Sequence, residues 1–329
     1  MLNSSTSEGR RARGTAANPP GLRKKRARGI IAVGGGKGGI GKTLVAANLG
    51  IALAQKGKKV ALVDADLGGA NLHTCLGLPQ PEVTLSDYVT GRVKKLEDAM
   101  IPTGVDNLFL IPGSQDALDA ANPKYQQKNK ILRNLANLDV DYLLLDLGAG
   151  TSLNTLDFFL LAHQGLVVLL PEPTSIENAY RFLRAAFFRR LQNLEEDGGI
   201  RDLVAAAITR REPALKTPFE FLTWVQSQSP SAAETLKKEV ASFHAGLIVN
   251  QSRSAADQDL GHAVVSAWRK FFGLNLDYIG AIGYDDEAWR AVRKRRPLLL
   301  DRPECLASAG LLGVAANLLA LDSRRNLRK

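Results

Sequence analysis

A glycine-rich segment at residues 34–43, GGGKGGIGKT, holds the side chains best suited to chemistry. It matches the phosphate-binding pattern G-x-x-x-x-G-K-[ST], in which glycines let backbone N–H groups approach an anion closely. In this pattern Lys42 reaches the β- and γ-phosphates of a nucleotide, and the Thr43 hydroxyl binds Mg²⁺. The alternative is a glycine-rich turn that binds no ligand. We predict that the nucleotide-binding residues are Gly36, Lys37, Gly38, Gly39, Ile40, Gly41, Lys42 and Thr43.

The elements predicted on either side of this loop support the phosphate-binding interpretation. The apolar residues 29–33 predict a strand, and residues 44–55 predict a helix that ends at Gly57. A helix that begins at the loop adds the positive end of its dipole to the phosphate site. Strand, loop and helix in this order are typical of a P-loop.

Three aspartates follow other predicted strands and are candidates to serve the loop. Asp146 ends the apolar run 141–146 and has the form of a carboxylate that holds the Mg²⁺ shell opposite Thr43. Asp64 and Asp66 follow a second apolar run, and one or both are candidates to face the phosphates and orient an attacking water. The alternative is that these aspartates cap turns or helices, where Asp is favoured.

Short apolar segments alternate with helical stretches along the rest of the chain. Strands are predicted at residues 29–33, 59–63, 108–111, 141–146, 166–170, 246–249 and 278–282. Nearly continuous apolar strands indicate an α/β fold with a doubly wound, mostly parallel sheet and helices on both faces. Ligands bind at the carboxyl ends of such strands, where the glycine loop, Asp64, Asp146 and Asn250 all lie.

The composition favours a soluble protein in a reducing compartment. Of the 329 residues, 45% are hydrophobic and 23% are charged, which is ordinary for a globular chain. Cys75 and Cys305 are far apart and match neither a disulfide framework nor a C-x-x-C metal site, so a cytoplasmic location is expected. No secretory signal is visible, and no segment is expected to reach the ~18 apolar residues of a membrane span.

The formal charge of +10 is concentrated near the N-terminus, and residues 1–28 are interpreted as a flexible basic arm. This arm either binds phosphates of nucleic acid or anionic lipid, or only keeps the protein soluble. A second basic run at residues 290–296 follows a helix start predicted at Asp285. It is either a solvated helix face or a candidate set of phosphate contacts.

The motifs together resemble the MinD/ParA family of deviant-Walker ATPases, closest to the branch of MinD and the flagellar site-determining regulators FlhG or FleN. Three stretches carry the resemblance: GGKGGIGKT at 35–43, VDADLGGANL at 63–72 and LDLGAG at 145–150. Weaker matches are PEPTS at 171–175, VNQ at 249–251 and YDD at 284–286. The fold implied is that of a P-loop NTPase.

The resemblance also implies roles for particular residues. Lys37 resembles the signature lysine that crosses to the nucleotide of a partner subunit, so ATP would be held between two copies of the chain. Asp66 resembles the residue that positions the hydrolytic water, and Asn250 resembles the one that contacts adenine. The chain lacks the guanine-reading motif N-K-x-D, which favours ATP with Mg²⁺. The expected catalytic residues are Lys37, Lys42 and Asp66, and the expected metal ligands are Thr43, Asp66 and Asp146.

Three features depart from the family pattern. The usual D-x-P-A-G is replaced by DLGAG at residues 146–150, so this switch is expected to move differently. The Pro common after the last strand is absent at Gly283 and Tyr284. Residues 187–244 exceed the length in a minimal member and predict two or three helices, one of them at 232–243. This region is either an inserted partner-binding or lid element, or an extension of the core.

The function expected from the resemblance is that of a MinD/FlhG-like switch. ATP would assemble a homodimer, a protein partner would stimulate its slow, Mg²⁺-dependent ATP hydrolysis, and the cycle would regulate placement or number of a division site or flagellum. The alternative is a ParA-type partition ATPase whose ATP-bound dimer binds nucleic acid. Through the basic arm, the protein would contact nucleic acid or, peripherally, the inner face of the plasma membrane.

The domain boundaries follow from these assignments. Residues 29–322 are predicted to form one P-loop ATPase domain, followed by a basic tail at 323–329. The apolar residues 310–321 predict a last helix packed on the sheet. The alternative is membrane targeting, in which only the basic tail would contact lipid.

Overall fold

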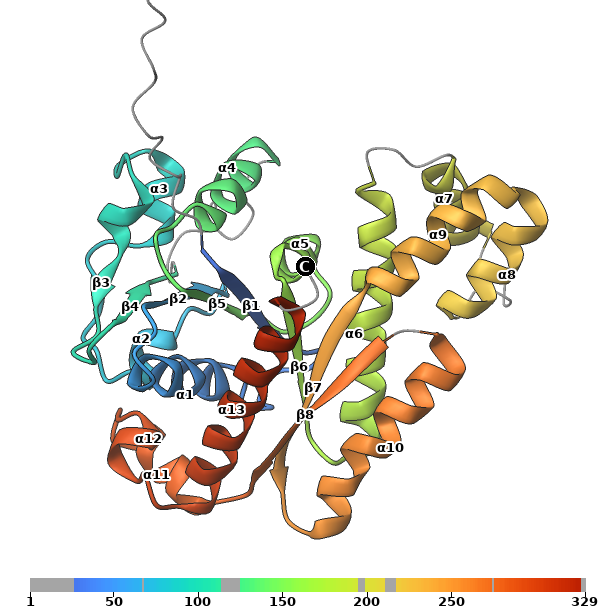
Figure 1. Ribbon diagram of the computed structural model, residues 1–329. Coiled ribbons are helices and arrows are strands. Elements are labelled where there is room, and N and C mark those ends of the chain that lie inside the picture. The colour runs from blue at the N-terminus through green and yellow to red at the C-terminus, as the bar shows by residue number, and fades with distance from the viewer. Residues whose placement is uncertain are drawn as a thin grey trace, which may run out of the picture.

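Parallel strands form the centre of the computed structural model, which describes residues 27–66, 68–113, 125–194, 199–210, 217–273 and 275–326. Their order across the sheet is β3-β4-β2-β5-β1-β6-β7-β8, and all described neighbours are parallel except β3 and β4. Figure 1 shows the sheet twisting between two layers of helices. The strands are β1 (Gly29–Gly34), β2 (Val60–Ala65), β3 (Ile101–Pro102), β4 (Leu108–Ile111), β5 (Tyr142–Leu147), β6 (Gln164–Leu169), β7 (His244–Ser252) and β8 (Asn275–Gly283).

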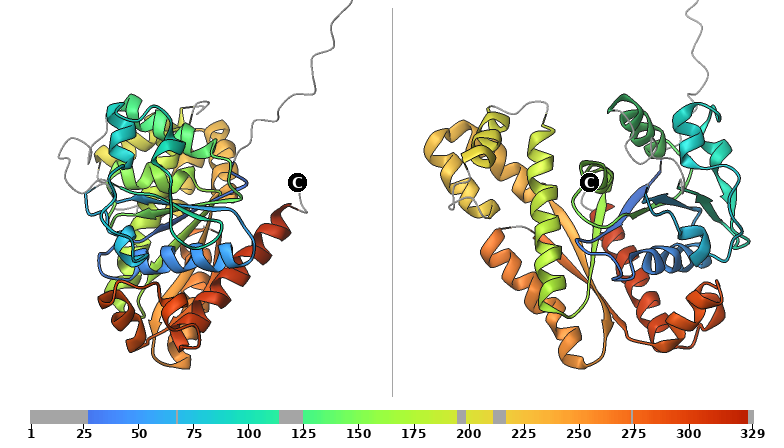
Figure 2. Two further views of the ribbon diagram at one scale, coloured as in Figure 1. Left: turned by 90° about the vertical axis from the view of Figure 1, so that its left-hand side faces the viewer. Right: turned by 180° about the vertical axis from the view of Figure 1, so that it is seen from behind.

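Helices lie on both faces of this sheet, as Figures 1 and 2 show. One side holds α1 (Lys42–Gln55), α2 (Leu72–Cys75), α11 (Asp286–Arg293), α12 (Leu298–Asp301) and α13 (Leu306–Asn326). The other side holds α3 (Leu85–Thr90), the short 3₁₀ helix η1 (Leu96–Ala99), α4 (Tyr125–Ala136), α5 (Leu153–Leu161), α6 (Pro173–Gln192), α7 (Ile200–Arg210), α8 (Pro218–Gln228), α9 (Pro230–Ser242) and α10 (Ala255–Phe272). The predicted doubly wound α/β fold is confirmed.

The strands are apolar along their whole length because alternate side chains enter both helical layers. On β1, Ile30 and Ala32 belong to the apolar core on one face, whereas Ile31 and Val33 belong to the core on the other. None of these four side chains is more than 4% exposed. A strand buried on both faces therefore shows no polar alternation, which is why the sequence predicts it as a continuous apolar run.

One strand was missed by the sequence prediction. β3 has two residues and pairs antiparallel with β4 at the edge of the sheet. It includes Pro102, which has no N–H to donate to a strand ladder and is tolerated only at such an edge. A two-residue strand is too short to show a recognisable pattern. The seven strands that the sequence did predict all overlap observed strands.

Helices α7, α8 and α9 lie within the region predicted at residues 187–244, and the helix expected at 232–243 is α9. Local capping signals start two of these helices. The Thr217 side chain accepts the backbone N–H of Glu220 at the start of α8, and Ser229 starts α9 in the same way. Pro follows each capping residue, where its fixed φ suits the first helical position.

The side chains between these helices belong to the main apolar core. Phe221 of α8 is fully buried and meets Phe188 of α6 with ring centroids 5.4 Å apart. Phe187 of α6 meets Phe243, at the end of α9, at 5.8 Å. Both contacts lie in the same cluster as the helices that cover the sheet. This shared burial favours an extension of the core over a separate inserted element.

Helix α13 crosses one face of the molecule and is drawn in red in Figure 1. Its side chains Leu311, Val314 and Leu318 are buried against α1 and β8, as predicted for the last helix. Its segment Leu306–Arg324 has a mean hydropathy of 1.5, which by length and composition is enough to cross a membrane. This corrects the expectation that no segment has that property. Within the fold, 33% of this segment is buried. Helices of soluble proteins also reach this length and hydropathy, so one such helix does not by itself indicate a membrane span.

The shared core leads to a prediction about Phe221. Phe221→Ala should lower the free energy of unfolding by about 3–5 kcal/mol, because it removes a fully buried ring. Unfolding in urea should remain one transition when followed by tryptophan fluorescence, which includes the neighbouring Trp224, and by far-UV circular dichroism. Phe219→Ala is the matched control: this ring, in the same helix, is 58% exposed, and its loss should change stability by less than about 0.5 kcal/mol. An earlier separate transition in wild-type protein would identify α7–α9 as an independent unit.

Candidate nucleotide-binding site

The predicted P-loop joins the carboxyl end of β1 to the first residue of α1. Gly39 and Gly41 have φ of 75° and 88°, in the left-handed region that glycine adopts without strain. Gly41 is also crowded, since a Cβ there would lie 2.5 Å from Nδ2 of Asn250. The loop therefore needs glycine at both positions, and it delivers the N-terminal end of α1 to the site.

The two lysines of the loop lie in different surroundings. Lys42 is 8% exposed, and its Nζ donates a hydrogen bond to the backbone oxygen of Lys37 at 3.1 Å. Burial lowers the pKa of Lys42, although the charges of Asp146 and Asp66 act in the opposite direction. The side chain of Lys37 is exposed. One lysine thus points into the site, and the other is accessible from outside.

Asp146 lies beside the P-loop strand because β1 and β5 are neighbours, with Val33 paired to Asp146. Its side chain is 1% exposed, and burial raises its pKa well above the ordinary value, with the charge of Asp64 acting the same way. A hydrogen bond with Thr43 acts in the opposite direction. Within the described residues, Oδ1 of Asp146 is buried and has no hydrogen-bond partner.

These features fit a Mg²⁺ site next to Thr43. A buried carboxylate oxygen beside a hydroxyl is the type of group that Mg²⁺ binds directly or through water, with phosphate oxygens completing its shell. In the described part of the chain, no three His, Cys, Asp or Glu side chains form a cluster that holds a metal by itself. The predicted ligand set of Thr43, Asp66 and Asp146 would therefore depend on a bound nucleotide.

Asp64 has a different role from Asp66. Asp64 pairs in register with Asp146 across β2 and β5 and is 1% exposed. Its carboxylate accepts the backbone N–H groups of Leu72 at 2.9 Å and Asp66 at 3.3 Å. Burial raises the pKa of Asp64 to about 6, although these hydrogen bonds lower it. Asp64 thus organises the turn that follows β2, as the capping alternative predicted, while Asp66 is only partly buried and its charge acts on Lys42.

Asn250 connects the end of β7 to the P-loop. Its Nδ2 donates to the backbone oxygen of Ile40 at 2.8 Å, and its Oδ1 accepts the N–H of Gln251 at 3.0 Å. Asn250 and Gly41 both line a cavity of about 640 Å³. Tyr284 and Trp289 line the same cavity, which has room and aromatic surface for a nucleotide base. Tyr284 thus lines the wall in the region where the family's usual Pro is absent.

A contact that the sequence did not reveal fixes the other side of the loop. Gly36 lies against α6, where a Cβ would be 2.1 Å from the backbone oxygen of Asn178. Phe182, one helical turn further along α6, lies under Gly34. Gly36 and Asn178 are 142 residues apart, and no local pattern links such distant positions, so only the folded chain shows that α6 supports the P-loop.

The basic run at residues 290–296 is engaged in local contacts. Asp301 forms ion pairs with Lys294 and Arg296, at 3.6 and 3.3 Å. Arg295 donates to the backbone oxygen of Leu78, and the guanidinium of Arg293 lies 4.7 Å from the ring centroid of Trp289. These contacts favour a role in fixing α11 and α12 over a role in binding phosphates. The basic arm falls outside the described residues except for Ala27 and Arg28, as does the end of the tail at 327–329.

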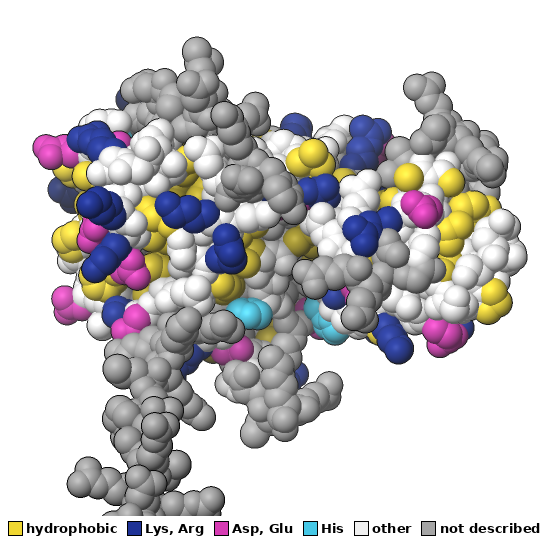
Figure 3. Space-filling view, turned by 90° about the horizontal axis from the view of Figure 1, so that it is seen from above, with side chains coloured by type: hydrophobic (Ala, Val, Ile, Leu, Met, Phe, Trp, Pro, Cys, Tyr) yellow, Lys and Arg dark blue, Asp and Glu magenta, His cyan; other side chains and the backbone are white. Residues whose placement is uncertain are grey.

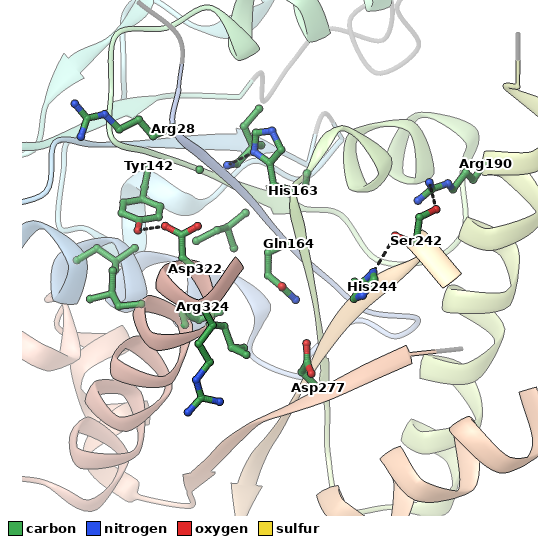
Figure 4. A pocket seen from close by; sticks show the side chains of 18 residues that line it. Arg28, Tyr142, His163, Gln164, Arg190, Ser242, His244, Asp277, Asp322 and Arg324 are labelled. Atoms are coloured by element: carbon green, nitrogen blue, oxygen red, sulfur yellow. Dashed lines mark hydrogen bonds between the residues drawn. The ribbon is translucent and has the colours of Figure 1, made fainter. Parts of the chain in front are cut away.

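A second cavity, about 680 Å³ in volume, lies at the amino ends of the strands, on the opposite edge of the sheet. Figure 4 shows hydrogen bonds between some of the polar side chains that line it. Tyr142 donates to Asp322 at 2.7 Å, and Ser242 accepts from Arg190 at 2.8 Å. Figure 3 views the molecule from above and shows Lys and Arg side chains spread over the visible face, with acidic ones among them. The glycine loop, Asp64, Asp66 and Asp146 are not among the residues that line this cavity.

Comparison with known proteins agrees with this geometry. A family model described as ParA, NUBPL iron-transfer P-loop NTPase, matches residues 26–193. The chain therefore belongs to the ParA family of P-loop NTPases.

Relatives place it within that family. The antiactivator FleN of Pseudomonas aeruginosa is 28% identical over 288 residues, which cover 87% of this chain and 84% of FleN. The septum site-determining protein MinD of Thermotoga maritima is 34% identical over 195 residues, covering 59% of this chain and 68% of that MinD. The predicted assignment to the MinD/FlhG branch, whose members regulate placement of a cellular machine, is confirmed.

Solved structures support the fold independently. MinD from Pyrococcus horikoshii, complexed with Mg-ADP, is 22% identical with a TM-score of 0.61, covering 88% of this chain and 95% of its own. MinD in the MinC:MinD complex of Aquifex aeolicus is 24% identical with a TM-score of 0.59, covering 89% and 96%. At these identities the likeness shows the fold. The complex of that Pyrococcus MinD with Mg-ADP supports nucleotide and Mg²⁺ binding in this family.

The raised pKa of Asp64 predicts a pH-dependent contribution to stability. Because the folded state binds this proton more tightly than the unfolded chain, protonated Asp64 favours folding at low pH, and this contribution is lost as the pH rises from about 4 to about 6. In nucleotide-free protein, the stability of Asp64→Asn measured by urea unfolding should therefore rise relative to that of wild type by about 2 kcal/mol between pH 4 and pH 7.

Asp157 is a control, because its pKa is shifted in the opposite direction from that of Asp64. Burial alone would raise its pKa, but hydrogen bonds and charges from Arg189 and Lys128 lower it below the ordinary value. Asp157→Asn should therefore lose stability relative to wild type as the pH rises through the acidic range. Equal slopes for both variants would contradict the assigned environment of Asp64.

Asn250 gives a prediction about nucleotide affinity. Asn250→Ala removes the side-chain bond that holds the P-loop at Ile40, so both ATP and ADP should bind about tenfold more weakly in isothermal titration calorimetry. Asn317→Ala is the control, because Asn317 also donates a 2.8 Å bond to a backbone oxygen, that of Ile279, in a different part of the fold. Wild-type affinity in the Asn250 variant would show that this bond does not hold the loop.

Proposed function

We propose that this chain is an ATP-dependent dimerising switch ATPase of the MinD/FlhG kind, which regulates the placement or number of a cellular machine such as a division site or a flagellum. The observation that carries the proposal is the pair of lysines in one loop. Lys42 is buried beside two aspartates, whereas Lys37 is exposed. A phosphate site formed by a single subunit would need only Lys42.

The other residues have distinct roles in this proposal. Lys42 and the N-terminal end of α1 bind the phosphates of ATP, and Thr43 with Asp146 holds Mg²⁺, which neutralises charge on the phosphates. Asp66 orients the water that attacks the terminal phosphate. Asn250 keeps the loop in place, and the cavity lined by Tyr284 and Trp289 receives adenine. Lys37 reaches the nucleotide of the partner subunit.

The output of the switch is proposed from the relatives. FleN is named an antiactivator, MinD is named a septum site-determining protein, and one solved MinD is complexed with MinC. We infer that the ATP-bound dimer presents a surface to a protein partner, that this partner stimulates a slow hydrolysis, and that hydrolysis separates the dimer. The ParA-type alternative gains no support from residues 290–296, which contact the protein itself. Contact of the basic arm at residues 1–28 with anionic lipid or nucleic acid stays a prediction.

The mass in solution tests the switch. Multi-angle light scattering should show a dimer with ATP and a monomer with ADP or without nucleotide. Asp66→Ala should stabilise the ATP dimer by slowing hydrolysis at least about 100-fold, and Lys37→Ala should abolish the dimer while leaving ATP affinity within about threefold. Lys58→Ala removes a lysine beyond the end of α1 and should behave like wild type. A monomer in every state would exclude the shared-nucleotide dimer.

A further inference from the structure

Gln251 has a backbone conformation that residues with a side chain rarely adopt. Its φ is 58°, in the left-handed region. The register between β7 and β8 shifts between Asn250 and Ser252, so Gln251 is an extra residue that bulges out of β7. A bulge changes the direction of a side chain, and in the G1 type of bulge the left-handed residue is a glycine. Glutamine at this position therefore costs strain that glycine would avoid, which points to a function for its side chain.

The strained residue lies at the cavity of about 640 Å³ beside the P-loop, which Asn250, Asp285 and Asp286 also line. The protein itself engages these three side chains. Asn250 donates to the P-loop backbone and accepts the N–H of Gln251. Asp285 accepts a backbone N–H at the start of α11, and Asp286 accepts the hydroxyl of Tyr284. By contrast, no group in the described part of the chain forms a hydrogen bond with the side-chain amide of Gln251.

We propose that the amide of Gln251 binds the edge of adenine that carries the 6-amino group and N7, and so selects ATP over GTP. The inference rests on the proposed function, which places adenine in this cavity. Adenine presents a donor beside an acceptor at this edge, and an amide offers the matching acceptor and donor. Guanine presents two acceptors there, so one of them faces the amide oxygen whichever way the amide is turned.

The test replaces Gln251 by glycine and measures the affinities of nucleoside diphosphates by isothermal titration calorimetry. Diphosphates are used because the proposed dimer needs ATP, so base binding is measured on the monomer. Glycine adopts the left-handed φ without strain, so the melting temperature of nucleotide-free Gln251→Gly should stay close to that of wild type. The affinity for ADP should fall at least about tenfold, whereas that for GDP should change by less than about threefold, since the lost pair belongs to adenine.

An analogue of ADP tests the pairing directly. Purine riboside diphosphate lacks the 6-amino group, so wild-type protein should bind it at least about tenfold more weakly than ADP. Gln251→Gly should bind this analogue and ADP about equally, because the partner of the 6-amino group is already gone. A full additional loss in the variant would place the 6-amino contact elsewhere and overturn the proposal.

Asn107→Gly is the matched control. Asn107 immediately precedes β4 and has a φ of 62°, so glycine relieves the same backbone conformation at a residue that does not line the cavity. This variant should bind ADP and GDP like wild type. The proposal is overturned by unchanged ADP affinity in Gln251→Gly, by equal losses for ADP and GDP, by the same loss in Asn107→Gly, or by equal affinities of wild-type protein for ADP and GDP. Wild-type protein that binds neither diphosphate would instead contradict the proposed function.

Discussion

Two buried carboxylates, Asp64 and Asp146, lie side by side in register at the carboxyl ends of β2 and β5. Both lose contact with water, and burial raises both pKa values because the charged form is the one that water stabilises best. Each carboxylate therefore needs hydrogen bonds or opposite charges from the protein to replace the lost contact with water. Asp64 obtains it from the N–H groups of Leu72 and Asp66, which fixes the turn after β2. Asp146 obtains it from Thr43 and Lys42 and keeps one oxygen for a cation.

The rest of the fold holds these groups in that arrangement. The parallel order β2-β5-β1 brings the ends of three strands to one edge, so the turn, the switch segment and the P-loop meet without any long connection. Helix α6 supports the loop from the other side through the contact of Asn178 with Gly36. The same helix reaches α9, where Arg190 pairs with Glu239 at 2.6 Å. With 20 residues it is about 30 Å long, so it joins α7–α9 to the phosphate site as one rigid element.

The sequence predicted what is encoded locally. The glycine loop, the apolar strands and the aspartates at their ends follow from residue type and short spacing, and each lies where it was expected. The division of roles between Asp64 and Asp66 was left open, because both follow the same strand. Only the folded chain shows that Asp64 is buried and bonded to Leu72, whereas Asp66 is partly buried. The bond from Asn250 to Ile40 and the contact at Gly36 join distant segments and have no local signal. The shared core of α7–α9 was likewise undecided, since packing is decided in three dimensions.

The placement of Lys37 follows from that of Lys42. The backbone oxygen of Lys37 accepts the bond from Lys42, so this peptide faces the interior of the site. The side chain of Lys37 is exposed, whereas that of Lys42 is buried, so the two ammonium groups lie in different surroundings. A cation in that position neutralises little charge on a phosphate bound in its own loop. It gains most from a phosphate presented by another molecule, where a dry interface makes the attraction stronger than in water. Under the proposed function, the lysine pair is therefore a physical reason for nucleotide binding and dimerisation to depend on each other.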